Sequence, residues 1–152
     1  MIFDVHSHTW RYPDHFNDTF RKQAIRMRGY EVDMSTDYSK YLETAQTAEQ
    51  SVRTVIFGGK ARLSGLWIPD RYVADYCRED PHHMIPFLSV DPTQEGWQDE
   101  MVKGHQDLGM KGIKLLPMYA GFYPQDEMLD DLWKYATLHN LPVLLHTGTT
   151  FV

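Results

Sequence analysis

The sequence predicts an α/β fold with a parallel sheet. Five short apolar segments alternate with four segments of helical periodicity along the 152 residues. Strands that alternate with helices pair in parallel, and their near-continuous apolar runs indicate that helices cover both faces of the sheet. Two architectures have this pattern: an open doubly wound sheet, and the first five strands and four helices of a (β/α)8 barrel. No glycine-rich fingerprint follows the first strand, which disfavours the dinucleotide-binding form of the open sheet.

Each expected strand is a short apolar run. The first ends at His8, the second is rich in β-branched residues and stops at Gly58-Gly59, and the fifth ends at His146. Pro86 lies inside the third strand and cannot donate a ladder hydrogen bond, so we expect an irregularity there. The five strands are expected at residues 1–8, 52–57, 84–90, 110–116 and 142–146.

The segments between the later strands have helical periodicity. Apolar residues first recur at three- and four-residue steps at Tyr38, Tyr41, Leu42, Ala45 and Ala48. Pro69 suits the first turn of the second helix. Thr93 is the expected N-cap of the third helix, and Gly109 is expected to end it. The fourth helix is expected over residues 126–139, with an apolar stripe at Met128, Leu129, Leu132, Tyr135 and Ala136.

Residues 9–36 show little sustained period. We expect an irregular surface excursion with a helical turn or two. A loop of this length after a strand often covers a site. Trp10, Tyr12 and the run 21–28 are therefore candidates to face a substrate.

Composition excludes several classes of partner. The net charge of -6 argues against a nucleic-acid partner, because no basic stripe is present to replace counterions. No apolar run approaches the ~18 residues needed to span a bilayer, and the chain enters a strand at once rather than a signal peptide. The single cysteine, Cys77, cannot form an internal disulfide, which favours the cytoplasm. Cys77 lies on an apolar helix face and is expected to pack in the core.

Two histidines one residue apart end the first strand. Side chains alternate along a strand, so His6 and His8 are expected to point the same way as Asp4. Their backbones are roughly 6.6 Å apart, which allows both imidazoles to reach one metal ion at about 2.1 Å. The spacing alone also fits two ordinary histidines at a strand end. His146 ends the fifth strand, where a barrel would bring it beside the first.

Polar and aromatic side chains also follow the fourth strand. Barrel active sites lie at the carboxyl ends of strands, so Tyr119, Phe122 and Tyr123 are expected to line a pocket there, although simple loop packing fits equally well. Lys114 would contact a substrate anion, bridge two metal ions or be an ordinary strand-end lysine. Lys60 and Arg62 follow the second strand; they could bind a carboxylate or phosphate, but we expect solvated loop cations.

Residues 3–8, 109–115 and 141–148 together resemble the amidohydrolase superfamily. The chain is most similar to the amidohydrolase-2 branch, the metal-dependent hydrolases and decarboxylases related to aminocarboxymuconate semialdehyde decarboxylase. The resemblance covers the whole chain and implies that residues 1–152 are the N-terminal part of one barrel domain. It also implies one divalent metal ion, with zinc favoured, bound by His6, His8 and His146.

The resemblance implies an enzyme in which a metal-activated water attacks an amide, ester or lactone bond of a small molecule. A metal-dependent decarboxylase is the alternative, and an inactive barrel fragment or non-catalytic α/β domain is a further one. The family's catalytic histidine and aspartate would lie beyond Val152, so the catalytic residues stay unassigned. Asp4 would orient His6 or be purely structural. A barrel needs roughly 250 residues, so we expect this chain alone to turn over poorly and to form homo-oligomers through unpaired strand edges.

Overall fold

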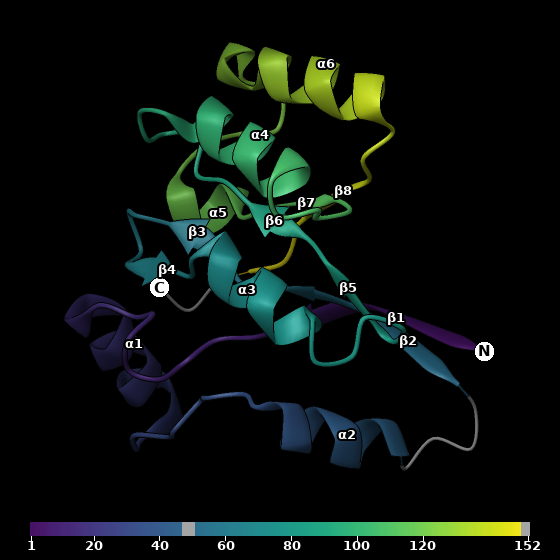
Figure 1. Cartoon of the computed structure of the whole chain (residues 1–152). Helices are drawn as coiled ribbons and strands as arrows, with labels where there is room; N and C mark the ends of the chain where they lie inside the picture. Colours follow the sequence, from purple (N-terminus) through teal and green to yellow (C-terminus); the bar gives the residue numbers. More distant parts are fainter. Residues whose placement is uncertain (47–50, 150–152) are drawn as a thin grey trace.

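The computed structural model describes residues 1–46 and 51–149 (Figure 1). Its parallel strands are β1 (Ile2–His8), β2 (Val52–Phe57), β5 (Met84–Pro86), β6 (Leu88–Ser89), β7 (Ile113–Leu115) and β8 (Val143–Leu145). They pair in the orders β1-β2-β5 and β6-β7-β8, always in parallel. Within each of these two sheets, every parallel strand therefore lies beside the parallel strand before it in the sequence. This succession is typical of a barrel, whereas a doubly wound sheet reverses its strand order.

The irregularity expected at Pro86 is confirmed. The third predicted strand divides at Phe87 into β5, which pairs with β2, and β6, which pairs with β7. The Phe87 amide still donates to the Ile56 carbonyl at 2.9 Å, and the Lys111 amide donates to the Pro86 carbonyl at 2.8 Å. These two hydrogen bonds connect the three-stranded sheet β1-β2-β5 to the three-stranded sheet β6-β7-β8.

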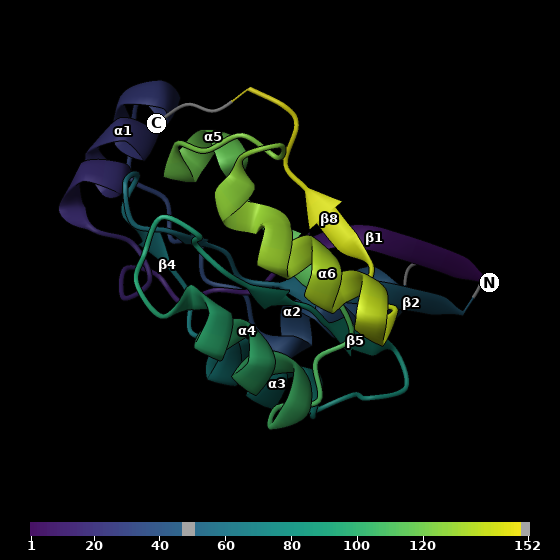
Figure 2. The same cartoon turned by 90° about the horizontal axis from the view of Figure 1, so that it is seen from above.

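Helices cover the strands from the outside. The helices are α1 (Asp18–Arg28), α2 (Tyr38–Gln46), α3 (Asp70–Cys77), α4 (Trp97–Gln106), α5 (Pro117–Ala120), the 3-10 turn η1 (Glu127–Leu129) and α6 (Asp130–His139). In Figure 1, α4 and α6 lie above the strands and α1 and α2 lie below them, and Figure 2 shows α3, α4 and α6 from above. None of the helices in the described ranges is long and apolar enough to cross a bilayer.

Three features were not predicted from the sequence: α1, a short hairpin, and the single turn α5 after the fourth strand. Where residues 9–36 were expected to be irregular, α1 forms a helix of 11 residues. The Asn17 side chain caps its start by accepting the Phe20 amide at 2.8 Å, and Gly29, with φ +82°, ends it. Only Phe20 and Ala24 of this helix are buried, so its apolar stripe is too narrow to produce a clear period. The second missed element is a short antiparallel hairpin, β3 (Lys60–Ala61) with β4 (Leu66–Trp67).

Several expected boundaries move. Thr93 does not cap α4; its hydroxyl donates to Asp91 at 2.6 Å, and the N-cap is Gly96. The last predicted helix is interrupted, because η1 precedes α6, and Met128 of its expected stripe is 46% exposed. Pro69 lies one residue before α3, at the N-cap. Ala48, expected in the stripe of α2, lies outside the described residues.

The core consists of two separate clusters of buried apolar residues. A small cluster of Val55, Phe57 and Phe87, with Ile85 and Leu144 against it, is separate from the larger cluster that includes most of the apolar helix faces. On β2 the two sets alternate, since Val55 and Phe57 belong to the small cluster and Ile56 to the large one. Cys77 is buried in the large cluster, as predicted.

Candidate functional site

The two histidines of β1 lie on the same side of the strand. Their ring centroids are 5.4 Å apart. Both rings approach the Phe57 ring edge-on, His6 at 5.2 Å and His8 at 4.5 Å between centroids. A β-bulge shifts the register of β1 against β2 between Asp4 and Ser7. The extra residue breaks the simple alternation between Asp4 and the two histidines.

His146 joins these histidines at one cavity of about 140 Å³. It directly follows β8, and its amide donates to the Leu115 carbonyl of β7 at 3.0 Å. Trp10 and Tyr119, both predicted to lie near a substrate, also line this cavity. The remaining lining residues are Phe16, Phe20, Arg28, Met34, Leu66 and Leu116.

His8 is held in a defined orientation. Its Nδ1 lies 2.9 Å from the Gly58 carbonyl oxygen, and because a carbonyl only accepts, Nδ1 carries the proton. Nε2 is therefore the atom with the free lone pair. The Trp10 indole stacks on the imidazole at 4.6 Å between centroids. Burial lowers the pKa of His8 to about 4, so the ring is neutral at neutral pH.

The surroundings of His6 also favour a neutral imidazole. Burial lowers the pKa of His6, and the nearby positive charge of Lys114 lowers it further. The Tyr119 ring meets the His146 ring edge-on at 5.2 Å. Neutral imidazole is the form that binds metal ions. The donor chemistry of His6, His8 and His146 thus fits a divalent metal ion such as zinc.

The three histidines share a cavity without forming a closed set of ligands. Within residues 1–46 and 51–149, no group of three or more histidine, cysteine, aspartate or glutamate side chains is close enough together to hold a metal ion. Asp4, expected to orient His6, is exposed. One of its carboxylate oxygens accepts the backbone amide of His6 at 2.9 Å, and the other accepts the Ser7 hydroxyl at 2.7 Å. Asp4 therefore braces the bulge of β1 through these two contacts.

Lys114 is not a solvated strand-end lysine. Its side chain is fully buried on β7, 4.7 Å above the centroid of the Phe57 ring. Among the described residues, its Nζ has no hydrogen-bond partner. Burial lowers the pKa of Lys114 to about 8. An amine in this state retains much of its charge near pH 7 and has unused donors.

The expectation of a solvated Lys60 is wrong. Lys60 is buried and forms ion pairs with Asp70 at 2.7 Å and Glu100 at 2.9 Å. The positive charge of Lys60 is therefore neutralised by two carboxylates of the same fold. Arg62 is exposed, and its guanidinium lies 3.9 Å from the centroid of the Trp67 ring.

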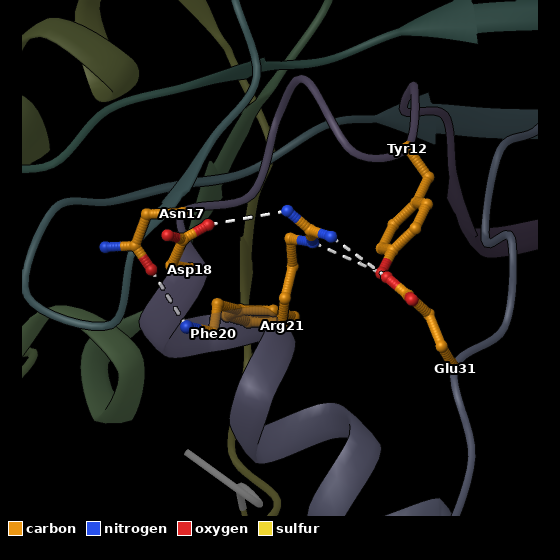
Figure 3. Close-up of polar contacts among 6 residues, drawn as sticks. All are labelled: Tyr12, Asn17, Asp18, Phe20, Arg21 and Glu31. Atoms are coloured by element: carbon orange, nitrogen blue, oxygen red, sulfur yellow. Dashed lines mark hydrogen bonds and ion pairs between the residues drawn. The ribbon is translucent and has the colours of Figure 1, made fainter.

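Helix α1 supplies one wall of the cavity through Phe20 and Arg28. Figure 3 shows the polar contacts at the start of this helix and those that fix it to Tyr12 before it and Glu31 after it. Arg21 donates to Glu31 at 3.0 Å and to the Tyr12 hydroxyl at 3.3 Å, and Tyr12 in turn donates to Glu31. The run 21–28 was a predicted candidate. Met34 and Leu116, which directly follows β7, were not identified, because no local pattern distinguishes an apolar residue that lines a site from one that packs in the core.

The fold and site together define a class of protein. A succession of neighbouring parallel strands with outer helices, and a histidine-lined cavity where strands end, are typical of part of a TIM barrel. An uncharacterised TIM-barrel protein of Bordetella bronchiseptica is similar, with a TM-score of 0.69 and 18% identity over 99% of this chain and 56% of that one. A structure described as an amidohydrolase II has a TM-score of 0.68 and 10% sequence identity, and the match covers 100% of this chain and 52% of that one. The 4-oxalomesaconate hydratase of Rhodopseudomonas palustris has a TM-score of 0.59 and 16% sequence identity, and the match covers 96% of this chain and 52% of that one.

The chain belongs to the amidohydrolase family, whose model matches residues 3–152. The predicted TIM-barrel fold is confirmed, and the chain spans about half the length of the similar structures. None of the curated proteins matches this sequence.

Proposed function

We propose that this protein is a metal-dependent hydrolase that cleaves an amide, ester or lactone bond of a small molecule. The observation that supports this most directly is that His6, His8 and His146, from the two ends of the described strand order, line one cavity. Membership of the amidohydrolase family supports an enzyme of this superfamily.

The three histidines line one cavity but would have to move closer together to hold one divalent ion, and their nitrogen donors favour zinc. When bound, such an ion supplies a Lewis acid that polarises a carbonyl and lowers the pKa of water toward ~7. His8 is prepared for this role, because the Gly58 carbonyl fixes the proton on Nδ1 and leaves Nε2 as the donor. The Trp10 ring stacked on His8 prevents the imidazole from turning away.

The residues of this chain would also orient the substrate. Lys114 is fully buried and is not among the residues that line the histidine cavity, so its charge would attract a substrate carboxylate from a distance rather than by contact. Tyr119 stands against His146 and would limit the space beside the reacting carbonyl. In the reaction, the oxygen of water bonds to the carbonyl carbon, the carbon–nitrogen or carbon–oxygen bond breaks, and a proton of that water passes to the leaving group.

Non-oxidative decarboxylation is the second candidate. A cation buried near the histidines, as Lys114 is, suits a substrate that carries a carboxylate. One of the similar structures is a hydratase, which agrees with the general rule that a barrel of this type hosts reactions besides hydrolysis. Release of carbon dioxide, as opposed to release of an acid and an amine or alcohol, separates the two reactions.

We further propose a cytoplasmic protein with a small-molecule substrate and without a nucleic-acid partner. The single cysteine, which is buried and free, suits a reducing compartment, and the net charge of -6 disfavours phosphate backbones. Self-association is proposed from β1, which pairs only with β2 within the described residues. Ile2, Phe3 and Val5 of this strand are 45%, 53% and 55% exposed.

Metal content tests the proposed function. The chain is loaded with zinc, dialysed and assayed by elemental analysis, beside a His6→Ala, His8→Ala double variant. A His82→Ala, His83→Ala variant is the matched control, because these exposed histidines lie outside the cavity. We expect about one zinc ion per chain in the native protein and the control and almost none in the first variant. Native protein that retains no zinc, or equal retention in all three, would refute the metal site.

A further inference from the structure

A second cavity adjoins the histidine-lined one. It has a volume of about 430 Å³, and His146 lines both cavities. Its other walls include Met118, Phe122, Tyr123 and Thr147. His146 therefore stands between a small cavity with three imidazoles and a larger cavity of different character.

Residues 117–124, which form most of the wall of the larger cavity, are held in place by hydrogen bonds. Helix α5 ends at Ala120, and the amide of its C-cap residue Gly121 donates to the Pro117 carbonyl at 2.8 Å. The Tyr123 amide donates to the Asp126 carboxylate at 2.7 Å, and the Trp133 indole donates to the Pro124 carbonyl at 3.2 Å. These contacts hold the chain open around the cavity without a ligand, which is the usual state of a small-molecule pocket.

The chemistry of its walls selects an uncharged, apolar group. No lysine, arginine, aspartate or glutamate is among the residues that line the cavity within the described part of the chain. Phe122 is buried behind it, whereas Met118 and Tyr123 are 53% and 69% exposed at its rim. Exposed apolar side chains are typical of binding surfaces, and their position at the rim of a cavity favours a small-molecule ligand over a flat protein contact.

Size decides how a substrate would divide between the two cavities. A cavity of about 150 Å³ accommodates one benzene ring. The histidine-lined cavity, at about 140 Å³, has room for an ion and a small carbonyl or carboxyl group but not for a ring as well. The neighbouring 430 Å³ accepts a ring with space to spare.

We propose that the cavity formed by Met118, Phe122 and Tyr123 binds an aromatic or similarly bulky apolar group of the substrate, whose reacting carbonyl lies on the other side of His146. This inference rests on the proposed function, since it takes the histidine-lined cavity as the reaction centre. It assigns a substrate class: a small molecule with an apolar ring next to the bond that reacts.

The test measures binding of a neutral aromatic probe, 4-fluorobenzyl alcohol, to the 152-residue chain by fluorine NMR, with 2-fluoroethanol as the ringless comparison. Only the aromatic probe is expected to bind saturably and to shift the imidazole protons of His146 through its ring current. Met118→Glu places a charge on the wall and is expected to raise the Kd about tenfold. Met128→Glu is the matched control, since Met128 is similarly exposed at 46% and lies outside the cavity.

A second pair of variants guards against a folding defect. Tyr123→Ala removes a rim ring and is expected to weaken binding, whereas Tyr30→Ala, at a site 67% exposed and outside the cavity, is expected to leave it unchanged. Absence of saturable binding, or equal weakening in variant and control, overturns the inference. Because the probe is neutral, it binds with or without zinc. If the protein retains zinc but does not bind the probe, this inference alone is refuted. If it binds the probe but does not retain zinc, the proposed function is refuted, and with it the assignment of this cavity to a substrate.

Discussion

Asp70, the first residue of α3, connects three neighbouring elements through one buried carboxylate. One oxygen accepts the Lys60 ammonium of β3 at 2.7 Å, and the other accepts the Ser89 amide of β6 at 2.9 Å. The Ser89 hydroxyl in turn donates to the backbone carbonyl of Lys114 at 3.0 Å. Asp70 therefore supports the strand that carries the buried lysine near the candidate site. Asp70→Ala would remove both of its contacts and leave a buried ammonium and a buried amide short of partners.

The magnitude follows from burial. Lys60 and Asp70 are 5% and 6% exposed, so solvent cannot replace the lost contact. Breaking a buried ion pair by removing one partner costs about 3–5 kcal/mol. Lys60 keeps its contact with Glu100, but Glu100 is 45% exposed and such a pair contributes at most about 1 kcal/mol. We expect Asp70→Ala to lower the free energy of unfolding by about 3–5 kcal/mol, a large share of the roughly 5–15 kcal/mol of a typical domain.

The charge itself is not what stabilises the fold. Burial raises the pKa of Asp70 despite the neighbouring Lys60, which indicates that desolvation outweighs the attraction. A Lys60→Met, Asp70→Leu double variant removes both charges and leaves only the Ser89 amide unpaired. Its expected loss is about 1–3 kcal/mol, smaller than that of the single variant.

Urea unfolding followed by tryptophan fluorescence and circular dichroism measures these differences. Glu100→Gln serves as the control and is expected to cost less than about 1 kcal/mol. A loss below about 1 kcal/mol for Asp70→Ala, or a double variant less stable than the single one, would refute the reasoning.

Two further predictions concern Cys77 and the edge of β1. Burial raises the pKa of Cys77 from 9.0 to about 12, so the thiol should resist iodoacetamide at pH 8 in the native protein and react with it in urea. Fast alkylation of the native protein would contradict this prediction. The neutral Cys77 thiol contributes its full stabilisation below pH 9, and this contribution is lost as the pH rises toward 12. The urea midpoint of the native protein should therefore fall between pH 9 and pH 12, and the midpoint of Cys77→Ala should fall less. Sedimentation velocity should show oligomers that Val5→Lys disperses and Leu138→Lys, at an exposed site on α6, does not; a monomeric native chain would disprove the association.

Local patterns predicted the strands and most helices well, because their causes lie within a few residues. The β-branched run of β2 and the proline in the third strand act on their own backbone, so both could be read from the sequence. Helix α1 was missed because its signals are its two ends, Asn17 and Gly29, rather than its face. Thr93 was misplaced as a cap because Asp91 competes for its hydroxyl.

The sequence by itself determined the order of strands and helices, the parallel α/β class and the likeness to amidohydrolases, because periodicity and short motifs are properties of neighbours along the chain. It also identified His6, His8 and His146 as candidates. Only the tertiary structure decided that these histidines share one cavity, that Lys60 is buried between carboxylates, and that an apolar cavity adjoins His146. The physical reason is that burial, pKa and pocket shape depend on residues tens of positions apart, which come together only when the sheet has formed.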